Sequence, residues 1–247
     1  MKTHAAIDRP ARVLVVMDQR LIAETVVLTL NHGAYLAKVT DLPVEAVQLV
    51  RDWQPHLAVV DMDLGDGELL RQLGVGRTGR ETTIPVIGLT RRGDLRTKLR
   101  AFEQGLDDIM TVPFPPEELL ARAVAVMRRA YGEPHQINPV IRIGEIEIDI
   151  LNREVRAGAS VIHLTGLEQS LLYLLAANAG RTISRDEILD TLWGTDFVSE
   201  SNVVDRHIRA LRVKLQNDWR RPRFIATVPG RGYRFLPTLS PPSGDAN

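Results

Sequence analysis

Five short apolar runs alternate with five amphipathic stretches over the first half of the chain. The runs have the length and valine content of buried parallel strands, and they are Arg12–Met17, Leu36–Val39, Leu57–Val60, Ile84–Leu89 and Asp108–Val112. The stretches have helical spacing, and they are Leu21–Leu30, Val44–Asp52, Gly67–Leu73, Leu95–Gln104 and Pro116–Ala130. This alternation predicts an α/β domain with a doubly wound, five-stranded parallel sheet.

Polar residues stand where several of these strands are expected to end. Asp18 follows the first strand, Asp61 ends the third and Thr90 ends the fourth, while Val112-Pro113-Phe114 follows the fifth. In a doubly wound sheet, ligands bind at the carboxyl ends of the strands. We therefore expect Asp18, Asp61 and Thr90 to lie together at one edge of the domain.

These residues make the segment of about residues 11–131 resemble the flavodoxin-like receiver domain of response regulators. The resemblance implies that Asp61 stands at the phosphoacceptor position and that Asp18 keeps one of two acidic positions that hold Mg²⁺. It also implies that the Thr90 hydroxyl faces the phosphoryl group. On this reading the partner that supplies the phosphoryl group is a histidine kinase.

Three positions depart from the receiver pattern. Met17 replaces an acidic residue, Val112 replaces a lysine and Ile109 replaces an aromatic switch residue. An acyl phosphate among carboxylates needs a divalent cation and a fixed ammonium to offset its charge. We therefore expect a degenerate receiver that works without phosphorylation, with at most weak Mg²⁺ binding at Asp18 and Asp61 and no other cofactor.

Several roles remain open at this edge on the sequence alone. Asp61 is either a residual phosphoacceptor or a carboxylate that caps the next helix. Arg91 or Arg92 would replace part of the missing positive charge, and Asp63 is either an extra carboxylate of the site or a helix cap. A conventional, kinase-driven response regulator is the alternative function.

An enzyme is the third possibility, because Asp61-Met62-Asp63 also fits the D-x-D motif of aspartyl phosphohydrolases. Those enzymes need a lysine at a matching strand end, and none stands there. We expect no catalytic residue and no enzymatic activity.

The second half begins with alternating β-type runs and continues with three helical stretches and a final hairpin. Thr165 with Glu168 and Ser184 with Glu187 form two capping boxes that open the first two helices. A third helix, which Ser199–Ser201 would cap, carries an apolar stripe on one side. A sheet, three helices and a hairpin predict an α+β winged helix-turn-helix.

Charge is distributed unevenly along the chain, although the total is zero with 31 basic and 31 acidic residues. Residues 200–235 hold 9 Lys and Arg against 3 Asp and Glu, a net charge of +6. A local basic surface, rather than the average charge, is what meets nucleic-acid phosphates. This segment predicts a partner of opposite charge, and double-stranded DNA fits it.

The second half is similar to the DNA-binding domain of OmpR/PhoB-type regulators over about residues 140–237. The matching motifs are LTGLEQSLLYLL, SRDEILDTLWG, SNVVDRHIRALRVKL and TVPGRGYRFLP. The resemblance implies that the third helix enters the major groove and that Arg231 on the wing enters the minor groove. The implied DNA contacts on the helices are Trp193, Asn202, Arg206, His207, Arg209, Ala210 and Arg212.

Arg206 and Ala210 should lie nearest the base edges, and the other helical contacts nearer the backbone. Trp193 either donates its indole N–H to a phosphate or only packs. Common members carry valine before the histidine and a second arginine at the position of Ala210. The arginine expected to contact bases, Arg206, therefore stands one helical turn earlier than in common members. This shift predicts a different operator sequence.

In this subfamily the receivers pair through the fourth helix, fifth strand and fifth helix. The matching charge pairs are Lys98 with Glu118 and Asp108 with Arg122, which implies a homodimer, with RNA polymerase as a further partner. We expect a receiver-like domain (1–131), a linker (132–139), a DNA-binding domain (140–238) and a disordered tail (239–247). With no cysteine and no long apolar run, the chain is expected in the cytoplasm, away from membranes.

Overall fold

The structure is a computed structural model that describes residues 10–30, 35–64, 68–73, 84–132, 140–143, 145–149, 152, 154–157, 160–194 and 202–236. The chain is divided into two compact units, residues 1–138 and residues 139–247. Residues 133–139 of the expected linker, the expected tail and the expected cap Ser199–Ser201 lie outside the described residues.

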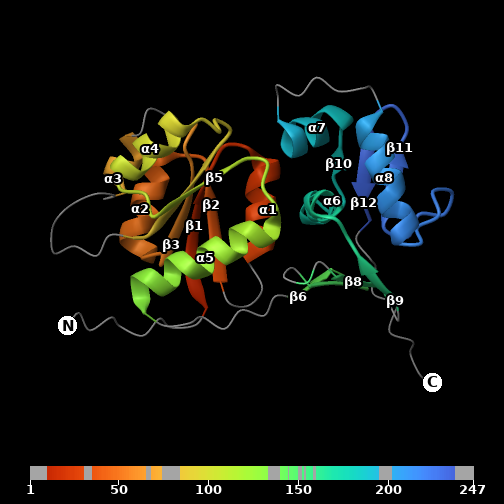
Figure 1. The fold of residues 1–247 in the computed structure, drawn as a ribbon, viewed down its shortest axis with the longest axis horizontal. Helices are drawn as coiled ribbons and strands as arrows, with labels where there is room; N and C mark the ends of the chain where they lie inside the picture. Colours follow the sequence, from red (N-terminus) through yellow and green to blue (C-terminus); the bar gives the residue numbers. More distant parts are fainter. Residues whose placement is uncertain are drawn as a thin grey trace. The chain divides into compact units, whose positions relative to one another are not determined.

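The first unit contains the predicted five-stranded parallel sheet, in the order β2-β1-β3-β4-β5 (Figure 1). Its strands are β1 (Ala11–Val16), β2 (Tyr35–Thr40), β3 (Leu57–Asp61), β4 (Val86–Thr90) and β5 (Asp108–Thr111). Central strands β3 and β4 are buried along their whole length, as expected for a sheet covered on both faces. The order places the carboxyl ends of β1, β3, β4 and β5 along one edge.

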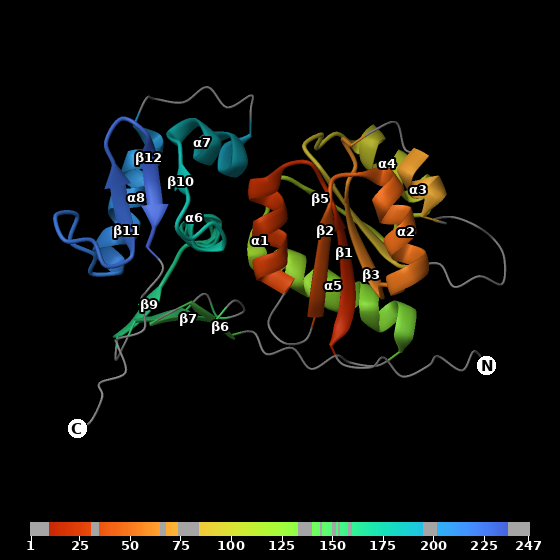
Figure 2. The ribbon, with the colours of Figure 1, turned by 180° about the vertical axis from the view of Figure 1, so that it is seen from behind.

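Helices cover both faces of this sheet, with α1 and α5 on one face and α2, α3 and α4 on the other (Figures 1 and 2). Their bounds are α1 (Arg20–Leu30), α2 (Pro43–Trp53), α3 (Glu68–Gln72), α4 (Leu95–Glu103) and α5 (Pro116–Tyr131). Strand residues Leu14, Val16, Ala58 and Val60 pack against α2, α3 and α4 in one apolar core. The predicted doubly wound α/β fold is therefore confirmed.

The second unit begins with a four-stranded antiparallel sheet in sequence order. Its strands are β6 (Val140–Ile143), β7 (Ile146–Asp149), β8 (Glu154–Ala157) and β9 (Ser160–His163). A second, three-stranded sheet has the order β10-β12-β11, with β10 (Thr182–Ile183), β11 (Ile225–Val228) and β12 (Gly232–Phe235). The hairpin of β11 and β12 is the predicted wing.

The helices in the described part of the second unit are α6 (Gly166–Ala177), α7 (Arg185–Trp193) and α8 (Val203–Lys214). The side chains of Thr165 and Ser184 accept hydrogen bonds in the two predicted capping boxes. Asn202 is the N-cap residue of α8. This architecture confirms the predicted α+β winged helix-turn-helix. Within the described residues, no helix combines the length and the apolar character that crossing a membrane requires.

Candidate nucleic-acid interface and receiver site

The polar edge of the first unit brings together Asp61 and Thr90, as the sequence predicts. Asp61 ends β3 with 8% of its surface exposed, and Thr90 ends β4 with 1% exposed. Asp18 follows β1, is exposed, and lies near enough to Asp61 for its charge to act on that carboxylate. The backbone N–H of Asp63 donates to Asp61 Oδ1 at 2.8 Å, which fixes the orientation of the Asp61 carboxylate.

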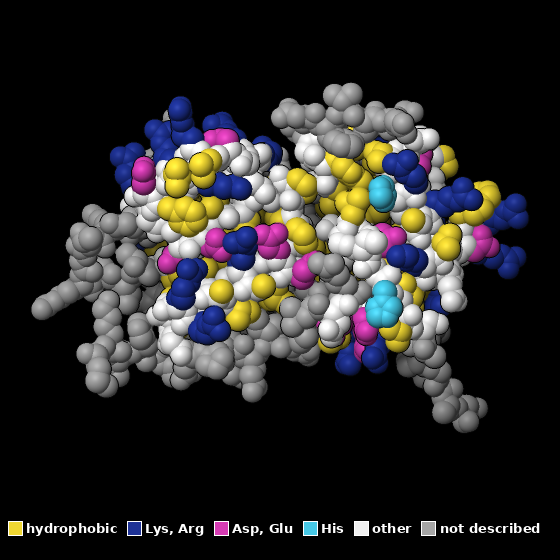
Figure 3. Space-filling view, in the orientation of Figure 1, with side chains coloured by type: hydrophobic (Ala, Val, Ile, Leu, Met, Phe, Trp, Pro, Cys, Tyr) yellow, Lys and Arg dark blue, Asp and Glu magenta, His cyan; other side chains and the backbone are white. Residues whose placement is uncertain are grey.

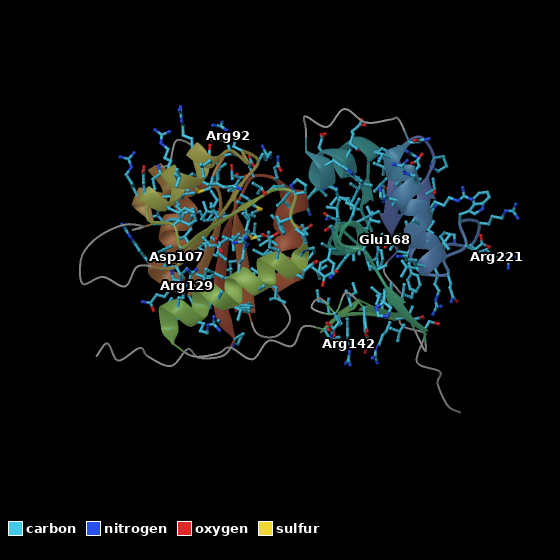
Figure 4. All side chains as sticks on the ribbon, in the orientation of Figure 1. Arg92, Asp107, Arg129, Arg142, Glu168 and Arg221 are labelled. Carbon is cyan, nitrogen blue, oxygen red and sulfur yellow. The ribbon has the colours of Figure 1, made fainter. Side chains whose placement is uncertain are left out.

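Two arginines after β4 surround this edge, and each approaches a different carboxylate. Arg91 Nη2 lies 3.8 Å from Asp61 Oδ2, and Arg92 Nε lies 3.6 Å from Asp63 Oδ1. The Asp63 carboxylate also accepts the Arg91 backbone N–H at 2.9 Å. Figure 4 labels Arg92 at this edge. The positive charge beside Asp61 therefore comes from Arg91, and Asp63 binds the turn that follows β4.

Burial is the largest effect on the Asp61 carboxyl and raises its pKa above the ordinary value. The Asp63 N–H and the Arg91 guanidinium lower the pKa, while the charges of Asp63 and Asp18 raise it further. The net shift is upward. The ionised form is therefore less favourable here than in water.

Three apolar side chains, those of Met17, Ile109 and Val112, stand at the positions where the sequence departs from the receiver pattern. Met17 is an apolar side chain with 3% of its surface exposed, and Ile109 is buried in the core. Val112 presents no charge; its N–H donates to Thr90 O at 2.8 Å, and its bond to Pro113 is cis. No group of three metal-ligating side chains occurs in the described part of the chain. At these two positions Met17 therefore offers no carboxylate to a cation, and Val112 offers no ammonium to an anion.

The expected dimer face combines an ion-pair cluster with an exposed apolar stripe. Arg122 Nη1 donates to both oxygens of Asp108 at 2.9 Å, and Arg122 Nη2 donates to Glu118 Oε1 at 2.7 Å. The pair of Asp108 with Arg122 is thus formed within one chain. Lys98 is half-buried on α4. The same helix exposes Leu95, Leu99 and Phe102.

Helix α8 has one apolar face and one polar face, as the sequence predicts. Val204, Ile208 and Leu211 are buried, whereas Arg206 and Arg209 are exposed and Ala210 is half-buried. Cations gather toward the end of the second unit that α8 occupies (Figure 3), and the segment that follows α8 exposes Arg220, Arg221 and Arg223. Figure 4 shows Arg221 pointing away from the domain. A basic, exposed helix face of this kind suits the major groove of duplex DNA.

His207 and Trp193 pack against each other between α7 and α8. Their ring centroids lie 5.4 Å apart, and both side chains are half-buried. Burial and the Arg206 charge lower the pKa of His207, against a smaller opposing effect of Glu168. The protonated imidazole of His207 is therefore less favourable here than in water.

Arg212 contacts the wing from within the protein. Its Nη2 donates to Ile225 O and to Thr227 Oγ1, each at 2.9 Å, and burial lowers its pKa. The sequence predicts Arg212 near the DNA backbone, and in the structure its guanidinium bonds the wing. Exposed Asn202 lies at the start of α8.

Arg231 is exposed in the turn between β11 and β12, where the sequence predicts it. Its backbone N–H donates to Val228 O at 3.0 Å, which closes the turn. Gly230 and Gly232 have φ angles of 67° and 134°, a region that favours glycine. The turn therefore presents a guanidinium at its tip.

A cluster that the sequence does not predict joins α7, α8 and the wing. Arg185 Nε donates to Asp205 Oδ1 at 2.7 Å, and the Tyr233 hydroxyl donates to the same oxygen. The one available signal was an aspartate beside Arg206 on an otherwise basic helix face. Such a residue needs a partner, but the sequence does not say which.

Comparisons with known proteins agree with both units. Residues 13–124 match the response regulator receiver domain, and residues 158–235 match the C-terminal domain of transcriptional regulatory proteins. The response regulator MprA of Mycobacterium sp. (strain KMS) is 35% identical over 227 residues, which cover 91% of this chain and 96% of the relative. The MprA of Mycobacterium tuberculosis (strain ATCC 25177 / H37Ra) is 34% identical over 225 residues, covering 90% and 96%.

Two solved structures are also similar. DrrB of Thermotoga maritima, an OmpR/PhoB homologue, is 30% identical, with a TM-score of 0.42 and coverage of 92% of this chain and 99% of that one. The DNA-binding domain of Klebsiella pneumoniae RstA, solved with the RstA box, is 35% identical, with a TM-score of 0.37 and coverage of 40% and 97%. On the sequence matches, the chain belongs to the OmpR/PhoB family of response regulators, which are DNA-binding transcription factors and not enzymes.

Proposed function

We propose that this regulator reads DNA with α8 in the major groove and Arg231 in the minor groove, while its receiver acts as a dimerisation module without phosphorylation of Asp61. The observation that carries the second part is the Arg91 guanidinium, which lies 3.8 Å from Asp61 Oδ2. A cation of the chain itself occupies the neighbourhood of the acceptor carboxylate, whereas Met17 and Val112 remove the usual metal ligand and lysine. Without a second acidic residue beside Asp18 and without a lysine ammonium, this edge offers less of the positive charge that an acyl phosphate needs.

The assignment of α8 to base reading rests on its two faces. Arg206 and Arg209 project from the side opposite the buried residues, so the helix can present them to DNA while its core contacts stay intact. Ala210 leaves space one turn after Arg206. Arg206 is the residue that we expect to bond a base edge, because arginine bonds guanine with two parallel donors. Asn202, His207 and Arg209 would contact phosphates.

Removing Arg206 tests base reading. The Arg206→Ala variant should lose about 1–3 kcal/mol of discrimination between a selected duplex and a scrambled one, the range for one bidentate base contact. Arg209→Ala is the matched control and should weaken binding to both duplexes alike. Fluorescence anisotropy at fixed salt measures both affinities. Equal weakening of both duplexes by Arg206→Ala would make Arg206 a phosphate contact and contradict its assignment to base reading.

Dimerisation through α4, β5 and α5 is supported by the exposed apolar residues of α4. Leu95, Leu99 and Phe102 lie at helical spacing on one side of that helix, and exposed apolar clusters mark interaction surfaces. Arg122 already binds Asp108 and Glu118 within the chain. Apolar contact, rather than new ion pairs, would therefore supply most of the association free energy.

A kinase-driven regulator is the second candidate, because Asp18, Asp61 and Thr90 keep three positions of the receiver site. Phosphoryl transfer to Asp61 would require Arg91 to take over the role of the missing lysine. In either case we place the protein in the cytoplasm, where it would act on the chromosome together with RNA polymerase.

A further inference from the structure

Asp205 is an acidic residue in the first turn of α8, a helix whose other charged side chains are basic. A carboxylate near the DNA phosphates repels them, so this position lowers DNA affinity unless the side chain serves another purpose. Its Oδ1 accepts a hydrogen bond of 2.7 Å from Arg185 Nε at the start of α7. The same oxygen accepts the hydroxyl of Tyr233 on β12. One carboxylate oxygen thus joins three elements.

Tyr233 lies between two guanidinium groups. The Arg185 guanidinium carbon is 4.9 Å from the centroid of its ring, and that of Arg212 is 5.5 Å away. The side chain is 4% exposed. Burial, together with the hydrogen bond to Asp205, raises the pKa of Tyr233 to about 12, so its hydroxyl keeps its proton and acts as the donor. The ring cannot move without breaking contacts to α7 and α8.

Arg212 completes the cluster on the side of β11. Its two bonds to Ile225 O and Thr227 Oγ1 connect the last turn of α8 to the first strand of the wing. Asp205 connects the first turn of α8 to the second strand through Tyr233. The wing is therefore attached to α8 at two points separated by two helical turns, which fixes the angle between the helix and the hairpin.

We infer that Asp205 is a positioning residue, which sets the angle between α8 and the wing so that both grooves of the DNA are read at once. The inference rests on the proposed function, because it concerns how that interface discriminates sequences. The Arg185 and Asp205 side chains are 37% and 43% exposed, and ion pairs of that exposure add little stability. The contribution of Asp205 is therefore to geometry more than to the free energy of unfolding.

A selection experiment with a matched control tests this role. The full-length wild-type chain first selects duplexes from a randomised DNA library, and affinities for a selected and a scrambled duplex are then measured. Asp205→Asn should lower the ratio of the two affinities about tenfold, on the order of one lost base contact. Asp218 lies in the same hollow beside α8 and is exposed, so Asp218→Asn removes an equal charge. It should leave the ratio unchanged.

Two further variants distinguish positioning from folding and from simple charge. Tyr233→Phe keeps the ring between Arg185 and Arg212 but removes the hydroxyl, and it should lower the ratio in the same direction by a smaller factor. In an Arg231→Ala background, Asp205→Asn should cost less than in wild type, because the contact that it aligns is already gone. Thermal unfolding of each variant shows whether it is still folded. If Asp205→Asn is unfolded, the affinity ratio of Tyr233→Phe tests the positioning role instead.

The outcomes separate the inference from the function on which it rests. An unchanged ratio in both Asp205→Asn and Tyr233→Phe, or equal effects of Asp205→Asn and Asp218→Asn, would overturn the positioning role. Additive losses in the Arg231→Ala background would do the same. Failure of the wild-type chain to select any preferred sequence would overturn the proposed function itself.

Discussion

Burial works against the negative charge of Asp61 at the end of β3. The carboxyl pKa is raised because desolvation outweighs the Asp63 N–H bond and the Arg91 guanidinium. A raised pKa means that the folded chain binds the proton more tightly than the unfolded chain does. Above that pKa the ionised carboxylate therefore costs stability. Ionised Asp61 therefore lowers the free energy of unfolding.

Replacing Asp61 by the neutral amide should stabilise the protein. In Asp61→Asn the Oδ1 atom still accepts the Asp63 N–H, and the buried charge is removed. The melting temperature should exceed that of wild type at pH 7, and the gain should shrink as the pH falls through the raised pKa toward the ordinary value of 3.8. Calorimetry between pH 4 and pH 7 measures this. Asp18→Asn, at an exposed position, should change little, and a lower melting temperature for Asp61→Asn at pH 7 would refute the argument.

At the residue scale, the sequence shows that Met17 and Val112 differ from the receiver pattern, but it does not show which side chain brings positive charge to Asp61. Met17 and Val112 are visible as departures because strand ends can be located from the apolar runs. Which of Arg91 and Arg92 approaches Asp61 depends on side-chain rotamers in a turn, which no local pattern encodes. Asp205 was missed for a related reason. Its partners come from residues 20 and 28 positions away, so they become visible only when α7, α8 and β12 are packed.

At the element scale, the helices with explicit capping signals were predicted best. Thr165 and Ser184 open α6 and α7 through the capping boxes that their sequences indicate. The third helix of the first unit was expected from Gly67 and is described as Glu68–Gln72. The wing was predicted from its β-type runs and its glycines. Its close approach to another strand was not, because β10 has only two residues and no periodicity.

That close approach leaves no room for a side chain at Gly232. Its φ is 134°, and a Cβ there would lie 2.0 Å from Ile183 O of β10. Gly232→Ala should destabilise the protein by at least the 1–3 kcal/mol of a strained backbone position, because backbone must also move. Gly230→Ala is the control; its φ is 67° with open space around the Cβ, so it should cost only about 1–2 kcal/mol. Chemical denaturation compares them, and equal losses would contradict the steric explanation.

At the scale of the whole molecule, the chain joins two units that differ in how many residues of their family's functional pattern they carry. The second unit keeps the capping boxes, the basic helix face and the wing that DNA binding needs. The first keeps the receiver fold, with Asp61 at the end of β3, while Met17 and Val112 stand where the resemblance implies an acidic residue and a lysine. The sequence sufficed for both folds because hydrophobic periodicity determines them. It did not suffice for the state of Asp61, which depends on the electrostatics of a packed site.

The most direct test of the account measures DNA affinity and oligomeric state with and without beryllofluoride and Mg²⁺, a stable mimic of the phosphorylated receiver. Wild type and Asp61→Ala are compared with a variant that combines Met17→Asp with Val112→Lys and so restores the receiver pattern. We expect the DNA affinity and the oligomeric mass of wild type and of Asp61→Ala to be the same with and without beryllofluoride and Mg²⁺. In the restored variant we expect both quantities to change when beryllofluoride and Mg²⁺ are added. A response of wild type that Asp61→Ala abolishes would contradict the account and establish Asp61 as a working acceptor.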